Sequence, residues 1–175
     1  MSRIQGFDEL MSRVAWFGLA VLILTTVHHI YGAYVYDTPW RLHVGFVSVF
    51  AAAAIAASLF ATRRAVNQVV RDFAFWVFVI VSLVVPVLLI GLFEGGYNHV
   101  LKDAMFFAGL PTSIFDRLFP PPMYEKPDDL FFEITGVMQL FPGALTGWWL
   151  YRLVRQRSSA RSRRTYDARA NVVNA

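Results

Sequence analysis

Four blocks of apolar residues, each about 20 residues long, set the strongest limit on how this chain of 175 residues can fold. The hydrocarbon core of a bilayer is about 30 Å thick, and a helix needs about 20 residues to cross it. The blocks cover residues 14–36, 42–61, 73–93 and 130–151. The sequence therefore predicts an all-α membrane protein built as a four-transmembrane-helix bundle, residues 14–151.

Two polar segments flank the predicted bundle. Residues 1–13 carry apolar side chains at near-helical spacing, which predicts a cytoplasmic lead along the membrane surface. Asp8 and Glu9 interrupt its basic character and no A-x-A-like cleavage site follows, so we expect an uncleaved anchor rather than a secretory signal. Residues 152–175 are basic, polar and poor in large apolar residues, which predicts a disordered cytoplasmic tail.

Charged residues divide the chain between two sides of the membrane. Twelve of the sixteen Lys and Arg residues lie in the N-terminal lead, the loop after the second block and the tail, whereas eight of the twelve Asp and Glu residues lie in the other loops or at the outer end of the fourth block. Short cytoplasmic segments collect Lys and Arg. We therefore expect an integral, multi-pass protein with both termini in the cytoplasm, in the inner (plasma) membrane if the source is a bacterium.

Histidines and carboxylates gather at the outer ends of all four blocks. The predicted metal-binding residues are His28, His29, His43, Glu94, His99 and Glu133, with Tyr97 and Asn98 as their supports. The middle of the blocks holds no ionisable residue, which disfavours a transport path through one chain. An unpaired ionisable group inside a bilayer costs a few kcal/mol, so this layer predicts a site at the outer face.

The outer loop, residues 94–129, carries helical apolar spacing that predicts short interfacial helices over this layer. Gly95 and Gly96 follow Glu94 directly. Glycine readily adopts the left-handed conformation that ends a helix. We therefore expect the third helix to end at Glu94 and the chain to turn back over the bundle.

The donor atoms restrict the chemistry of such a site. The chain has no cysteine, which excludes thiolate ligands and cysteine-ligated clusters. Imidazoles and carboxylates without sulfur suit iron, zinc, copper or manganese. No H-E-x-x-H or Glu-x-x-His repeat is present, so only the clustering carries the prediction. The class we expect is a metal-binding protein, with a metal-dependent membrane oxidoreductase or hydrolase for a lipophilic substrate as its enzymatic form.

Three alternatives stay open at this stage. The histidines could ligate haem b in a quinone-linked electron-transfer subunit. The chain could be a non-catalytic subunit of a membrane complex or a homo-oligomer, since Gly143 and Gly147 form a Gly-x-x-x-Gly pattern. The histidines could also be ordinary interfacial residues of an aromatic belt. Beyond the lipid bilayer, the basic tail is a candidate for anionic lipid, and nucleic acid is not an expected partner.

Overall fold

The computed structural model describes the backbone of residues 3–173 and the side chains of residues 6–160, and it is helical with no strand over that range. The elements in chain order are α1 (Arg3–Val35), η1 (Pro39–Leu42), α2 (His43–Arg64), α3 (Gln68–Ser82), η2 (Leu83–Leu101), α4 (Lys102–Phe107), α5 (Thr112–Leu118), α6 (Leu130–Met138) and α7 (Leu140–Val173).

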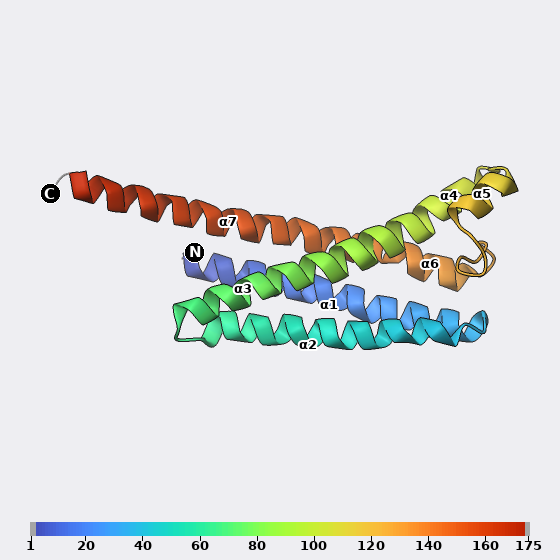
Figure 1. Ribbon diagram of the computed structural model, residues 1–175, viewed down its shortest axis with the longest axis horizontal. Coiled ribbons are helices and arrows are strands. Elements are labelled where there is room, and N and C mark those ends of the chain that lie inside the picture. The colour runs from blue at the N-terminus through green and yellow to red at the C-terminus, as the bar shows by residue number, and fades with distance from the viewer. Residues whose placement is uncertain (1–2, 174–175) are drawn as a thin grey trace.

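The helices form an elongated bundle (Figure 1). Helix α1 packs against both α2 and α7, α3 packs against α2, and η2 packs against α7. Both ends of the described chain lie at one end of the bundle, while η1, α4, α5 and α6 lie at the other, which we call the distal end (Figure 1).

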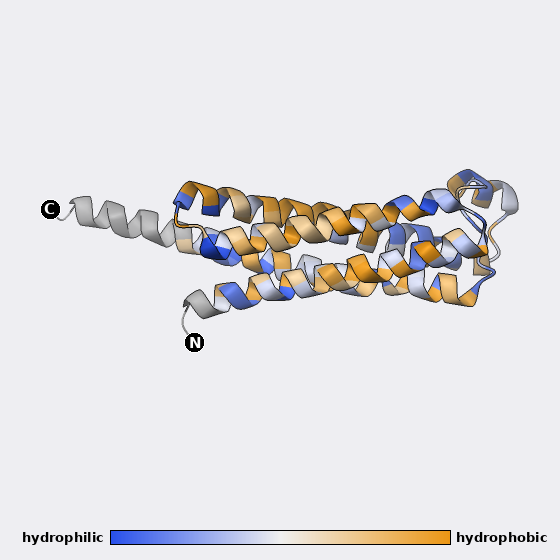
Figure 2. Ribbon diagram, turned by 90° about the horizontal axis from the view of Figure 1, so that it is seen from below, coloured by the Kyte–Doolittle hydropathy of each residue, from blue (hydrophilic) through white to orange (hydrophobic). Residues whose placement is uncertain are grey.

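Three helices are long and apolar enough to cross a membrane: Gly6–Val35, Pro39–Arg64 and the continuous helix Gln68–Phe107. Their large apolar side chains point outward as well as inward, and Trp16, Phe50 and Phe60 expose 73%, 74% and 67% of their surface. Figure 2 shows apolar residues along the length of the helices, with hydrophilic residues toward the bundle ends. A helix that is apolar all round suits a lipid environment, so these helices form a bundle of the kind found in membrane proteins.

The third helix does not end at Glu94, contrary to the expectation from the glycine pair. It continues through η2, a π-helical segment, and through α4 to Phe107. Gly95 does not form a turn but allows the backbone of residue 140 to approach closely. A Cβ on Gly95 would lie 2.6 Å from the backbone nitrogen of Leu140. The glycine therefore brings η2 against the start of α7.

The fourth apolar block is divided in two at Gln139. Helix α6 ends at Met138 and α7 begins at Leu140, so no single unbroken helix covers residues 130–151. Pro142 explains the break, because it has no N–H to donate to the carbonyl of Met138 four residues earlier. The structure thus supports three spans directly and leaves the fourth as two joined helices.

The flanking segments continue the neighbouring helices. Helix α1 begins at Arg3, so the lead is collinear with the first apolar block rather than separate from it, and Met11 is fully buried in the bundle. Helix α7 runs on to Val173 through the tail whose composition predicts disorder. The tail contains no Gly or Pro after Gly147, and helix-breaking residues are therefore absent from it.

The turn between α2 and α3 depends on a side-chain cap. The Asn67 side chain accepts hydrogen bonds from the backbone N–H groups of Val69 (2.8 Å) and Val70 (3.4 Å). We expect Asn67→Ala to lower the free energy of unfolding by about 1 kcal/mol, since an N-cap side chain contributes about that much. Thermal unfolding in detergent measures the change, and Asn67→Asp, which keeps the acceptor, is the control. Equal losses for both variants would contradict the capping role.

Three side-chain contacts tie the loop before α6, residues 119–129, to the end of α1 and to η1. Tyr31 donates to Asp129 at 3.0 Å, Tyr36 donates to Asp128 at 2.8 Å, and Arg41 lies 3.5 Å from Glu125. Arg41 is only 6% exposed. These contacts hold the start of α6 against α1, which fixes the position of the side chains described next.

Candidate metal centre

Three side chains from two helices place their donor atoms around one point near the distal end. His28 Nε2 on α1 lies 3.5 Å from Glu94 Oε1 on η2, His99 Nε2 lies 3.6 Å from the same oxygen, and the two Nε2 atoms are 3.1 Å apart. By plane geometry the point equidistant from these three atoms lies about 2.0 Å from each, which matches a metal–imidazole bond of about 2.0–2.1 Å. The triangle therefore has the size of three ligands on one ion.

A third imidazole reaches the same carboxylate. His29 Nε2 lies 3.6 Å from Glu94 Oε1. The donor atoms of His28, Glu94 and His99 all lie within 4.8 Å of one another, and His29 is not part of this group. His29 therefore contacts the site through Glu94. His28 is fully buried and His99 is 2% exposed, which removes both from bulk water.

The other ring nitrogen of each histidine has a partner that fixes the tautomer. His29 Nδ1 lies 2.9 Å from the Thr25 carbonyl oxygen, which can only accept a hydrogen bond. His99 Nδ1 lies 2.7 Å from Glu133 Oε2, which also can only accept while Glu133 is ionised. His28 Nδ1 lies 3.0 Å from Thr135 Oγ1, whose own proton goes to the Phe131 carbonyl at 2.8 Å.

Each Nδ1 is thereby assigned as the donor, and each Nε2 presents a lone pair toward Glu94. This is the arrangement that metal-ligating histidines adopt, with the second ring N–H given to a carbonyl, hydroxyl or carboxylate.

Glu133 supports the site from α6 and does not belong to the triangle. Its Oε2 accepts from His99 and its Oε1 accepts from Lys102 Nζ at 2.9 Å. Lys102 is 2% exposed and also donates to the Glu125 carbonyl at 3.0 Å. A second potential donor group, His99, Asp103 and Glu133, surrounds this position. The Lys102 ammonium already supplies a positive charge there, so the His28 triangle is the better place for an ion.

The π-helical conformation brings Glu94 and His99 toward one face. Residues five apart point about 140° away from each other in an α-helix. In a π-helix the hydrogen bonds join residues five apart, so Glu94 and His99 lie closer to one line along the helix. Asn98 donates to Glu94 Oε2 at 2.6 Å, which leaves Oε1 directed at the imidazoles.

Close packing with α6 also fixes the positions of the His28 and His99 rings. Phe132 stacks on His28 with ring centroids 4.1 Å apart, and Gly32 makes room for it, since a Cβ there would lie 2.4 Å from that ring. A Cβ on Gly136 would lie 2.3 Å from the His99 ring. These two glycines thus let the rings sit between α1, η2 and α6.

The structure brings together most of the residues that the sequence singled out. His28, Glu94 and His99 surround one point, and His29 lies against Glu94. Glu133 binds His99 from behind, and Asn98 binds Glu94.

Two of the predicted residues lie elsewhere. His43 is exposed, and its Nδ1 bonds the Trp40 carbonyl at 2.5 Å. Tyr97 donates to the Leu118 carbonyl at 3.1 Å, so it contacts the end of α5 instead of the site.

Lys102 and Asp103 are parts of the arrangement that sequence reasoning missed. Both fall in the predicted outer loop, because the glycine pair predicts a helix end at Glu94. Their spacing of three and four residues after His99 could have revealed them, since side chains at that spacing share a helix face.

The separation of His28 and His99 also bears on haem. Two ligands on opposite faces of one haem iron, each about 2.0 Å from it, lie about 4 Å apart. The 3.1 Å separation of their Nε2 atoms is shorter than this. The geometry therefore favours adjacent ligands of a single ion.

Together the fold and the site define a helical protein with helices of membrane-spanning length and a buried histidine and carboxylate group that could hold a metal ion. The chain matches no family model, and no curated protein or solved structure resembles it significantly. Its function therefore has to be argued from the chemistry of these residues.

Proposed function

We propose that this protein binds one transition-metal ion through His28, Glu94 and His99, with His29 placed against Glu94, and uses it as a metal-dependent membrane enzyme on a lipophilic substrate. One observation carries the proposal: the Nε2 atoms of two imidazoles and a carboxylate oxygen lie 3.1 to 3.6 Å from one another in a buried site. Such groups repel unless a cation lies between them. A proton would link only two of them, whereas a metal ion can bind all three.

The donor set suits iron, zinc, copper or manganese. Two histidines and one carboxylate leave coordination positions open, and open positions are what a substrate or water needs to reach the ion. The Glu133 carboxylate next to His99 would raise the basicity of that imidazole and hold its ring in place. These features support an enzymatic role over a purely structural one.

The finer topology is part of the same proposal. We place the joined helices α6 and α7, residues 130–151, across the membrane as a fourth span, with both termini on the cytoplasmic side. The charge distribution supports this placement through the positive-inside rule. The metal centre at the distal end then faces the non-cytoplasmic side, and its substrate would enter from the bilayer.

Metal analysis of protein purified in mild detergent tests the proposal. We expect a stoichiometric transition metal in the wild-type protein and loss of at least nine-tenths of it in His28→Ala, because one of three short-range ligands is removed. His43→Ala is the matched control, since His43 is exposed at the same end of the molecule and bonds the Trp40 carbonyl instead of the site.

Mass spectrometry of the eluted metal gives the identity and the ratio per chain. A wild-type protein that holds no metal after incubation with iron, zinc, copper and manganese salts would overturn the proposal. Equal metal content in the His28 and His43 variants would place the ion elsewhere.

A further inference from the structure

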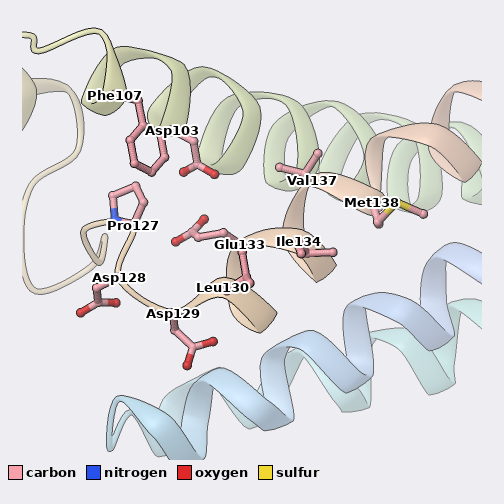
Figure 3. Close-up of a pocket in the computed structure, with 10 residues that line it drawn as sticks. All are labelled: Asp103, Phe107, Pro127, Asp128, Asp129, Leu130, Glu133, Ile134, Val137 and Met138. Carbon is pink, nitrogen blue, oxygen red and sulfur yellow. The ribbon is translucent and has the colours of Figure 1, made fainter.

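Helix α6 lies between a pocket and the candidate metal centre. The pocket has a volume of about 580 Å³ and opens beside α4 (Figure 3). The α6 residues that line it, drawn as sticks in Figure 3, are Leu130, Glu133, Ile134, Val137 and Met138. Residues three and four apart share one face of a helix, so these five mark the pocket face of α6.

The other face of α6 covers two of the candidate metal ligands. Phe132 stacks on His28, and Thr135 Oγ1 lies 3.0 Å from His28 Nδ1. Gly136 meets the His99 ring, because a Cβ on that glycine would lie 2.3 Å from it. Residues 132, 135 and 136 therefore form the face of α6 that is turned toward the candidate metal centre.

Gln139 continues this second face by one turn. It lies four residues after Thr135 and three after Gly136, and its backbone keeps helical angles of φ −64° and ψ −28°. At about 100° per residue it projects between those two neighbours. A long side chain on a helix lies back over the preceding turn, toward the N-terminus. The Gln139 side chain thus extends toward the histidine rings, past a glycine that has no side chain to block it.

The backbone of Gln139 is also held beside a candidate metal ligand. A Cβ on Gly95 would lie 3.2 Å from the Gln139 carbonyl carbon. Gly95 directly follows Glu94 in the sequence. Gln139 therefore lies at the depth of Glu94 in the bundle, on the neighbouring helix.

The Gln139 amide is buried without a hydrogen-bond partner. The residue is fully buried, and neither Oε1 nor Nε2 has a partner in the described part of the chain. Burying an amide that makes no hydrogen bond costs free energy, and such a group in a protein indicates a bound ligand, ion or water. A carboxamide has two N–H donors on Nε2 and an acceptor on Oε1.

We infer that the Gln139 amide binds a small anionic ligand in an open coordination position of the metal ion, with Nε2 donating a hydrogen bond to that ligand. This inference rests on the proposed function, because it adds a ligand-binding residue to the same site. Two histidines and a carboxylate leave positions open on the ion, and Gln139 extends toward them from α6. The ion and the amide N–H then stabilise the negative charge of the ligand together.

Azide binding to the copper-loaded full chain in detergent tests the inference. Azide is a small anion that coordinates Cu²⁺ and accepts hydrogen bonds, and electron paramagnetic resonance follows its binding. We expect Gln139→Leu to keep its copper and to bind azide at least about tenfold more weakly than the wild-type protein, the value of one hydrogen bond to a charged group. Equal azide affinities, or a wild-type protein that holds copper but binds no azide, would overturn the inference.

The unfolding temperature of the metal-free protein separates ligand binding from a structural role. The amide has no partner in the described chain, and leucine fills a similar volume, so Gln139→Leu should not lower that temperature. A lower unfolding temperature together with wild-type azide affinity, or a variant that does not fold, would show a structural amide and overturn the inference.

Ser82→Ala is the matched control. Ser82 Oγ is likewise fully buried and without a partner among the described residues. Ser82 lies twelve residues before Glu94 along the same continuous helix, which places it more than two turns from the site. We expect Ser82→Ala to leave azide affinity unchanged, and a loss equal to that of Gln139→Leu would overturn the assignment to Gln139.

Copper content measured on the same samples separates this inference from the proposed function. A nitrogen and oxygen site that binds iron, zinc or manganese binds Cu²⁺ more tightly, so wild-type protein that takes up no copper would overturn the metal proposal itself. Copper-loaded wild-type protein with the azide affinity of Gln139→Leu would overturn the role of Gln139 alone. Loss of copper in Gln139→Leu would make Gln139 a metal ligand and would overturn its role as a donor to the bound anion.

Discussion

Lys102→Met is expected to lower the free energy of unfolding by about 3–5 kcal/mol, the cost of leaving one partner of a buried ion pair without the other. Lys102 is 2% exposed, and its ammonium lies 2.9 Å from Glu133 Oε1 and 3.0 Å from the Glu125 carbonyl. Methionine fills a similar volume, so the loss would report the charge rather than a cavity. Denaturant unfolding in detergent, followed by tryptophan fluorescence, measures it.

A double variant distinguishes the charge from other effects. Lys102→Met combined with Glu133→Gln removes both charges and keeps an amide oxygen that can accept from His99 Nδ1, so it should recover most of the lost stability. Arg13→Met is a control at an exposed ion pair, where Arg13 and Glu9 are 44% and 41% exposed and the expected loss is about 1 kcal/mol or less. Additive losses in the double variant would show that Lys102 and Glu133 do not stabilise each other.

The presence of this pair shows what a sequence pattern can and cannot resolve. The apolar blocks predict helices of membrane-spanning length because burial in lipid demands continuous apolar residues, and three such helices are present. Whether a charged residue near a block end belongs to the helix or the loop depends on its tertiary partners. Lys102 is helical because Glu133, 31 positions later, satisfies its charge inside the bundle.

The helix ends were the least predictable feature for the same reason. Gly95 and Gly96 favour a turn locally, but the close approach of α7 to Gly95 gives the glycine a packing role that outweighs this preference. Whereas the helix continues past the two glycines, Pro142 interrupts one. It divides an apolar block that hydropathy alone predicts to be a single helix.

The candidate site was visible in the sequence as a set of residue types at one depth. His28, His29, Glu94 and His99 could be chosen because imidazoles and carboxylates are costly inside a bilayer. Their roles could not be assigned, because the tautomer of each ring depends on groups such as Thr25, four residues before His29, and Glu133, 34 residues after His99. His43 has the same side chain, and only its exposure separates it from the others.

Gly143→Ala is the second substitution expected to have a large effect, because α7 and η2 cross there with their backbones in contact. A Cβ on Gly143 would lie 2.5 Å from Gly91 Cα and 3.3 Å from the Pro86 carbonyl oxygen. Backbone atoms cannot rotate away as side chains do, so the two helices must separate. Overpacking of this kind costs about 1–3 kcal/mol, and we expect a loss at the upper end of that range.

Gly18→Ala in α1 is the matched control for this crossing, since the nearest atom to a Cβ there is Pro86 Cγ at 3.6 Å, an ordinary contact. Both substitutions gain the same helix propensity, about 1 kcal/mol in favour of alanine. The difference between their unfolding free energies therefore measures the effect of the close contact at Gly143. Gly91 lies three residues before Glu94 on the same helix, and separation of η2 from α7 would therefore move Glu94 relative to His28. We expect Gly143→Ala to lower both the unfolding temperature and the metal content, and Gly18→Ala to lower neither. Equal unfolding temperatures for the two variants would show that the crossing tolerates a side chain and is looser than the structure describes.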